Sequence, residues 1–174
     1  MSRIIRRVKQ PGVYFVTTGT WQRRELFLNL EPATIVLDHL LECRERGFYK
    51  LHAFVLMMPD HLHFLITPGA ETSLEKAVQM VKGGSAFKIR KALNYKFPVW
   101  HEGYHDRWIR DAIEYRTRKQ YIEQNPVRTH LSETAARYAF GSASGMFALD
   151  ECQFEVAISE SRASAAKAVS GSLA

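Results

Sequence analysis

The stretch LHAFVLMMPDHLHFLIT (residues 51–67) decides the fold of this chain. Residues 51–58 form an almost continuous apolar run, which is typical of a buried strand. Pro59 and Asp60 follow as a tight corner, and residues 61–67 form a second run rich in apolar residues. Two such runs joined by a short turn predict a β-hairpin.

The segments on either side of this hairpin supply further strands and helices. A pair with capping-box spacing, Thr72 and Glu75, predicts the start of a helix that meets Gly83–Gly84 and is weakened or bent there. Asn125–Pro126 is expected to end the last helix, because a residue before proline avoids helical geometry. The other predicted elements are a strand at 13–20, a helix at 31–46, a strand at 97–100 and a helix at 111–124. This order predicts an α+β fold, a ferredoxin-like antiparallel sheet with packed helices.

Length and composition favour one soluble domain. The chain has 174 residues, of which 46% are hydrophobic and 24% charged. No run approaches the length of a membrane span, and the N-terminus lacks the apolar core of a signal peptide, so we expect a cytoplasmic protein without a membrane partner. Cys43 and Cys152 stand apart and predict neither a zinc site nor a disulfide framework.

The positive charge is concentrated in the first three quarters of the chain. Residues 1–130 contain 21 Lys and Arg against 13 Asp and Glu, whereas residues 131–174 contain 3 against 5. Such a surplus favours a nucleic-acid partner, although a solvated basic surface explains it equally well. We predict a domain at 1–147 and a tail at 148–174 that is largely disordered, because Ala and Ser dominate its end.

Two histidines occupy one face of the second strand of the hairpin. Side chains alternate across a strand, so Leu62, Phe64 and Ile66 are expected in the core while His61 and His63 share the opposite face. A pair of imidazoles in this arrangement can bind one metal ion. Hydrogen-bonded or exposed histidines are the alternative.

The last predicted helix places a tyrosine on its polar side. At 100° per residue, Tyr121 shares a side with Thr117, Gln124 and Asn125, whereas Tyr115 and Ile122 lie on the core side. An amphipathic surface tyrosine is the ordinary interpretation. The amide of Asn125, four residues later, suggests a second interpretation, in which Tyr121 and Asn125 reach the same point above the sheet.

Three segments, taken in order, carry a family resemblance. They are MMPDHLHFLI at 57–66, VWHEGYHDRWIRD at 99–111 and YIEQNPVRTHL at 121–131. Together they resemble the single-tyrosine HUH transposases of the IS200-like superfamily, and most of all the REP-associated tyrosine transposases. The likeness spans about residues 13–131.

The resemblance implies an activity and a set of site residues. It implies a metal-dependent transposase that cleaves and rejoins hairpin-forming palindromic DNA through a 5′-phosphotyrosine, acting on single-stranded or hairpin DNA. Tyr121 would be the nucleophile, and His61, His63 and Asn125 the ligands of Mg²⁺ or Mn²⁺, with Gln124 in reserve. We expect a bacterial, nucleoid-associated protein that is a monomer or a homodimer.

Several basic residues are candidates for DNA contacts. Arg3, Arg6 and Arg7 resemble the basic arm of REP-associated relatives, and a solvated terminus is the alternative. Lys82, beside Gly83–Gly84, is a candidate for a phosphate contact. Arg116 and Lys119 flank the tyrosine turn and either hold DNA or form a solvated helix edge.

Two other functions remain open from the sequence. One is a catalytically silent ferredoxin-like protein that binds DNA hairpins, such as a repressor, whose affinity would not depend on Tyr121. The other is a structural metal-binding domain without DNA affinity.

Overall fold

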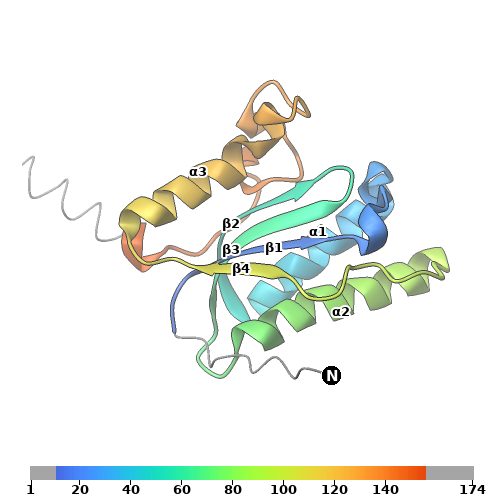
Figure 1. Cartoon of the computed structure of the whole chain (residues 1–174), viewed down its shortest axis with the longest axis horizontal. Coiled ribbons are helices and arrows are strands. Elements are labelled where there is room, and N and C mark those ends of the chain that lie inside the picture. The colour runs from blue at the N-terminus through green and yellow to red at the C-terminus, as the bar shows by residue number, and fades with distance from the viewer. Residues whose placement is uncertain (1–10, 156–174) are drawn as a thin grey trace, which may run out of the picture.

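The computed structural model describes residues 11–155, which form a four-stranded sheet with helices on both faces (Figure 1). The strands are β1 (Tyr14–Gly19), β2 (Tyr49–Met57), β3 (His61–Pro68) and β4 (His105–Trp108). The helices are α1 (Leu30–Glu45), α2 (Leu74–Leu93) and α3 (Ala112–Arg128). The order in the sheet is β2-β3-β1-β4, and each neighbouring pair is antiparallel. The predicted α+β fold is confirmed.

Each face of the sheet has its own apolar core. Leu62, Phe64 and Ile66 of β3 pack with residues of α1 and α2, as the alternation in the sequence predicts. On the opposite face, Leu65 packs with Tyr115 and Ile122 of α3. The face that carries His61 and His63 is therefore covered in part by α3, while α1 and α2 lie on the other side (Figure 1).

The predicted hairpin is present as β2 and β3. Its register pairs Val55 with His63 and Met57 with His61, and the turn contains Pro59 and Asp60 after a cis Met58–Pro59 peptide. The backbone carbonyl of Asp60 accepts a hydrogen bond from the Thr20 amide at 2.8 Å. This bond ties the hairpin turn to the end of β1.

The last strand lies further along the chain than predicted. The segment 97–100 contributes only an isolated bridge between Trp100 and Thr20, and the strand that pairs with β1 is β4. Pro98 explains the difference in part, because proline has no amide hydrogen to donate to a ladder. The prediction of a strand at 97–100 was wrong.

The last helix does not end at Asn125–Pro126. α3 continues through the proline to Arg128, and the amide of Thr129 still donates to the carbonyl of Asn125 at 3.1 Å. Asn125 and Pro126 are both buried, so tertiary packing outweighs the local preference of the residue before proline.

α2 differs from expectation at two points. Ser73 is its N-cap, and its side chain accepts a hydrogen bond from the Lys76 amide, so the predicted cap at Thr72 was one residue early. The helix also continues through Gly83–Gly84. A Cβ atom at Gly84 would lie 1.9 Å from Nε2 of His39, so this glycine allows α1 and α2 to approach closely.

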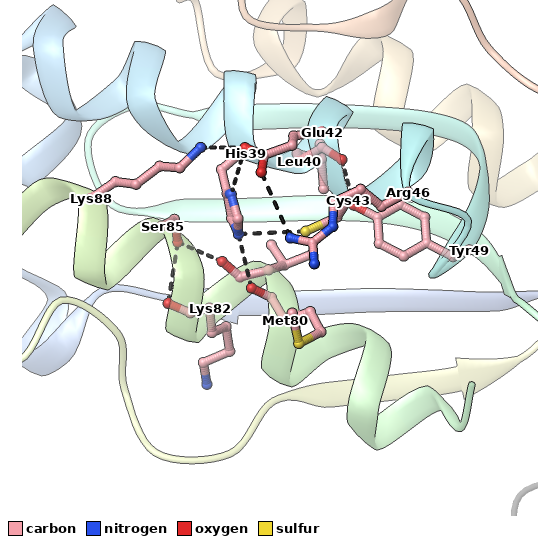
Figure 2. Close-up of polar contacts among 11 residues, drawn as sticks. His39, Leu40, Glu42, Cys43, Arg46, Tyr49, Met80, Lys82, Ser85 and Lys88 are labelled. Carbon is pink, nitrogen blue, oxygen red and sulfur yellow. Dashed lines mark hydrogen bonds and ion pairs between the residues drawn. The ribbon is translucent and has the colours of Figure 1, made fainter. Parts of the chain in front are cut away.

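Hydrogen bonds reinforce the contact between α1 and α2 (Figure 2). His39 Nε2 lies 3.0 Å from the carbonyl oxygen of Met80 and 3.4 Å from Cys43 Sγ. Glu42 accepts a hydrogen bond from Lys88 of α2. Burial raises the pKa of the Cys43 thiol to about 11, and both Cys43 and Cys152 are free and buried. This cluster holds the helix layer on the face away from the histidine pair.

Residues after α3 cover the outer edge of β2. The Leu56 amide donates to the Phe140 carbonyl at 2.9 Å, and the Asp150 amide donates to the Leu51 carbonyl at 2.8 Å. The Asp150 carboxylate also accepts two hydrogen bonds from Arg44. Contacts with the sheet thus continue past residue 147, the predicted end of the domain, to Asp150. Among residues 11–155, no helix is long and apolar enough to span a membrane.

Candidate active site

The two predicted histidine ligands lie side by side on β3. The ring centroids of His61 and His63 are 4.9 Å apart, because residues two apart on a strand project from the same face. His63 is 6% exposed, and His61 is more open. Burial, with a smaller contribution from His61, lowers the pKa of His63 to about 3. His63 is therefore neutral at physiological pH, as a metal ligand must be.

Both rings are oriented through their Nδ1 atoms. His61 donates from Nδ1 to the buried Asp60 carboxylate at 2.8 Å, and Arg23 Nε contacts the other carboxylate oxygen at 2.9 Å. His63 Nδ1 lies 2.7 Å from the hydroxyl of Thr17 on β1. When Nδ1 of His63 carries the proton and donates to Thr17, the Nε2 lone pair is available. A carboxylate or hydroxyl on the second ring nitrogen is the usual support of a metal-binding histidine.

α3 places Tyr121 against His63, one of the two histidines. The ring centroids of Tyr121 and His63 are 5.5 Å apart with the planes nearly perpendicular. Phe15 of β1 contacts both rings, stacked on His63 at 5.5 Å and edge-on to Tyr121 at 5.9 Å. Tyr121 is half-buried, so its position is set by packing against the sheet. The predicted nucleophile and the predicted histidine ligands therefore meet at one place.

The two candidate amides lie one turn further along α3. Asn125 is 7% exposed, whereas Gln124 is partly exposed. At 100° per residue, position i+4 is rotated about 40° around the helix axis from position i, and position i+3 about 60° in the opposite direction. Asn125 therefore projects slightly closer to the direction of Tyr121 than Gln124 does. Burial on the Tyr121 side of α3 thus agrees better with Asn125 as the third ligand. Within 11–155, no group of three His, Cys, Asp or Glu residues has metal-site spacing.

Two arginines near the tyrosine were not predicted as site residues from the sequence. The guanidinium carbon of Arg128 lies 6.0 Å from the Tyr121 ring centroid, and that of Arg118 lies 5.5 Å from the Phe15 ring. The Nε atom of Arg118 is buried and has no hydrogen-bond partner among the described residues. Their spacing of three and seven residues from Tyr121 was a helical signal that pointed to the same side of α3.

Three of the basic residues predicted to contact DNA, Lys82, Arg116 and Lys119, lie away from Tyr121. Arg116 is exposed, and Lys119 forms an ion pair with Glu155; both are turned about 140–160° around α3 from Tyr121. Lys82 donates to the carbonyls of His101, at 2.8 Å, and Gly103, and burial lowers its pKa. Arg3, Arg6 and Arg7 lie outside the described residues, and DNA contacts by all six stay predictions.

An open cleft lies beside the histidine face. It has a volume of about 480 Å³ and runs from Thr17 to the segment 101–105. His105 pairs with Thr17 across the strands, and Thr17 in turn pairs with His63. Since residues in register share a face, the cleft adjoins the site from the β4 side. Thr17 and Phe15 could not be linked to the site from sequence, because their contacts depend on strand register. Asp60 directly precedes His61, so its neighbourhood to that residue was visible in the sequence.

Comparisons with known proteins give the family. The family model described as "Transposase IS200 like" matches residues 13–125. A solved structure, a REP-associated tyrosine transposase bound to a REP hairpin, is similar with a TM-score of 0.66 at 21% identity, covering 87% of this chain and 92% of that one. That likeness supports the fold. A crystal structure of a putative transposase from Deinococcus radiodurans R1 has a TM-score of 0.49 at 21% identity, covering 71% and 97%.

No curated protein matches this chain. The family model nevertheless spans β1 to the fourth-last residue of α3, and so includes both histidines and Tyr121. The chain therefore belongs to the IS200-like transposase family.

Proposed function

We propose that this protein is a metal-dependent transesterase of the HUH class that cleaves and rejoins single-stranded DNA through Tyr121. The observation that carries the proposal is the contact between the Tyr121 and His63 rings, 5.5 Å between centroids, on a face where both histidines are oriented through Nδ1. A phenol held beside an imidazole that is oriented in this way is suited to attack a phosphate bound at the histidines.

The donor atoms suit a divalent cation such as Mg²⁺ or Mn²⁺. His61 and His63 would hold it through Nε2 because their Nδ1 atoms are engaged, and Asn125 would add an amide oxygen, with Gln124 in reserve. A bound cation of this kind supplies Lewis-acid stabilisation of charge on the scissile phosphate. Nitrogen ligands favour Mn²⁺ over Mg²⁺, so we expect activity with both and tighter binding of Mn²⁺.

Tyr121 carries the covalent step. Its phenolic oxygen attacks phosphorus as its proton passes to solvent, the bond from phosphorus to the 3′-oxygen breaks, and that oxygen takes up a proton. The products are a 5′-phosphotyrosine and a free 3′-hydroxyl. Attack by a 3′-hydroxyl on the same ester reverses the step, so rejoining requires no nucleotide cofactor.

The other residues of the site position the phosphate and the phenol. Arg118 and Arg128 place positive charge on the Tyr121 side of α3, where a phosphate must lie for attack. Phe15 fixes the Tyr121 ring by an edge contact at 5.9 Å. The half-buried phenol meets a phosphate only if the backbone can approach closely, which favours an unpaired strand over a duplex.

We propose hairpin-forming palindromic repeats as the substrate. The support is the basic balance of residues 1–130 and the fold shared with a transposase that was solved bound to a REP hairpin. With one nucleophile per chain, a monomer must use Tyr121 for each cut, whereas a homodimer supplies two. The proposal is compatible with both.

Covalent capture tests the mechanism. Hairpin DNA from the flanks of the gene, labelled on the 3′ side of the cut, is mixed with Mn²⁺ and protein, and adducts are separated in SDS. Wild type is expected to form an adduct that is lost in Tyr121→Phe and after chelation. Tyr115→Phe is the matched control. Tyr115 is on the same helix, but its phenol is buried in the apolar core between α3 and the sheet.

The silent-binder alternative gives a different result in the same experiment. A protein that only binds hairpins would show equal affinity for wild type and Tyr121→Phe and would form no adduct with either. A structural metal domain would bind Mn²⁺ without any affinity for the hairpin. An adduct that persists in Tyr121→Phe would contradict the assignment of the nucleophile.

A further inference from the structure

An aromatic and cationic cluster lies on two loops outside the tyrosine site. Trp21 and Phe97 have nearly parallel rings, 15° apart in plane with centroids separated by 6.2 Å. The guanidinium carbon of Arg24 lies 3.8 Å from the Phe97 centroid and 4.9 Å from the Trp21 centroid. Tyr95 contacts Phe97 edge-on at 5.9 Å. We call Trp21, Arg24, Tyr95 and Phe97 the aromatic cluster.

The aromatic cluster is open to solvent. Phe97 is 46% exposed, and Trp21, Arg24 and Tyr95 are partly exposed. Large aromatic side chains usually bury most of their surface, and exposed apolar patches mark interaction sites. Arg24 lies against the face of Phe97, so a planar cationic group already stacks in the cluster.

The backbone that presents Trp21 and Arg24 is strained. Gln22 and Arg23 both have φ of 55°, in the left-handed region that residues with a Cβ seldom adopt. The turn is held by its neighbours, since the Trp21 amide donates to the Val99 carbonyl at 3.0 Å. This bond links the Trp21 loop with the Phe97 loop. Strain of this kind persists only where surrounding contacts impose it, and it concentrates at ligand-binding sites.

The same turn is joined to the histidine pair. Arg23 contacts the Asp60 carboxylate at 2.9 Å, and that carboxylate accepts a hydrogen bond from His61. Gln22 and Arg23 also line the cleft of about 480 Å³ that borders Thr17. Contacts from His61 through Asp60 to Arg23 thus connect the histidines with the turn that carries Trp21 and Arg24.

We propose that the aromatic cluster is a stacking site for an unpaired base of the DNA strand whose neighbouring phosphate occupies the tyrosine site. The inference rests on the proposed function, and it adds the surface that selects an unpaired strand. Every base has a π face, so aromatic stacking binds single strands with little dependence on sequence. A base in a duplex is already stacked on both sides, so this site takes only unpaired DNA.

Charge near the cluster agrees with a nucleic-acid ligand. Three basic residues are neighbours of the rings in the sequence: Arg23, Arg24 and Lys96. One acidic residue, Glu25, follows Arg24. Arg23 is engaged with Asp60 and Lys96 with Asn94, which leaves Arg24 on the ring face as the cation that meets a base or its phosphate. An arginine and two aromatic rings are the groups that stack on bases in single-strand binding sites.

Photocrosslinking tests the contact without any substitution. A poly-dT oligonucleotide and the hairpin DNA with its unpaired flank, each carrying single 5-iodouracil substitutions, are irradiated with wild-type protein and the crosslinked peptides are mapped. The expected crosslinks are to Trp21 or Phe97. Crosslinks confined to other aromatic residues, such as Phe15 or Trp108, would overturn the proposal.

Matched substitutions measure the contribution of the cluster. Binding is measured in the Tyr121→Phe background, so cleavage plays no part. Phe97→Ala is expected to weaken binding of poly-dT about tenfold and to leave a hairpin without an unpaired flank unchanged. Phe87→Ala is the control, because Phe87 is 65% exposed on α2 and lies outside the cluster. Equal affinities for the two variants would reject the stacking site.

The two proposals fail in different ways. If wild type forms the Tyr121 adduct while Phe97→Ala binds poly-dT as tightly as Phe87→Ala does, the stacking site is wrong and the transesterase stands. If poly-dT crosslinks to Trp21 or Phe97 and no hairpin forms an adduct, the stacking site stands and the covalent mechanism is wrong. Thermal unfolding of each variant confirms that the fold is intact.

Discussion

His63 on β3 and Thr17 on β1 are directly opposite each other in the sheet, and their side chains meet at 2.7 Å between Nδ1 and Oγ1. The contact depends on the register of two strands that are separated by helix α1 and strand β2 in the chain. It fixes the orientation of a buried, neutral imidazole. Phe15, on the same strand, stacks on the face of the His63 ring, while Thr17 binds its edge, so β1 contacts the imidazole in two directions.

Thr17→Val is expected to weaken Mn²⁺ binding about tenfold, because it removes the hydrogen bond that orients His63. Isothermal titration with Mn²⁺ measures the effect. Thr18→Val is the matched control, since the Thr18 hydroxyl is buried without a partner among the described residues, and its loss should leave the fold as stable or more so. Equal Mn²⁺ affinities in the two variants would show that Thr17 does not support a metal ligand.

Arg118→Ala is expected to lower the rate of adduct formation about 100-fold. The substitution removes a positive charge from the Tyr121 side of α3, where the scissile phosphate is proposed to bind. Arg118→Lys should recover part of the rate. Arg116→Ala removes an exposed charge from the far side of the same helix; a DNA contact there would change affinity, so the rate at saturating DNA should change by less than about threefold. Single-turnover kinetics with hairpin DNA distinguish the two. A similar loss in both variants would indicate a general charge effect.

Gly84→Ala is expected to destabilise the protein by about 2–3 kcal/mol, because the new Cβ would lie 1.9 Å from Nε2 of the buried His39. Gly83→Ala should stabilise it by about 1 kcal/mol, since a Cβ at Gly83 meets no atom and alanine favours a helix. Urea unfolding of both variants provides the comparison. If both substitutions stabilise the protein, the close approach of α1 and α2 is not as described.

Acid should destabilise the link between β4 and α3 at Glu114. Burial raises the pKa of Glu114, but hydrogen bonds from Arg110 and Arg107 outweigh it and lower the pKa to about 2. A carboxylate with a depressed pKa stabilises the fold above its ordinary pKa of 4.5, and the stabilisation disappears as pH falls from 4.5 towards 2.

Glu114→Gln should therefore flatten the decline of unfolding free energy between pH 5 and about pH 2.5, as measured by urea unfolding. Glu133→Gln is the control, because that carboxylate is 79% exposed in its pair with Arg137. A decline in Glu114→Gln as steep as in wild type would place the acid-sensitive groups elsewhere.

The sequence predicted the elements that depend on local patterns. Alternation identified the core face of β3 and the shared face of His61 and His63, and helical spacing assigned Tyr115 and Ile122 to the core side of α3. Local preferences failed where packing opposed them. α3 runs through Pro126 because Asn125 and Pro126 are buried, and α2 runs through Gly84 because α1 packs there.

For the candidate site, the sequence by itself determined which side chains have suitable chemistry: two imidazoles on one strand face, and a phenol with an amide on one helix face. Periodicity along the chain decides this, since strand and helix geometry act over a few residues. Only the tertiary structure decided which groups support them. Thr17 contacts His63, and Phe15 contacts both His63 and Tyr121, because strand register and helix packing bring together residues that no local pattern relates.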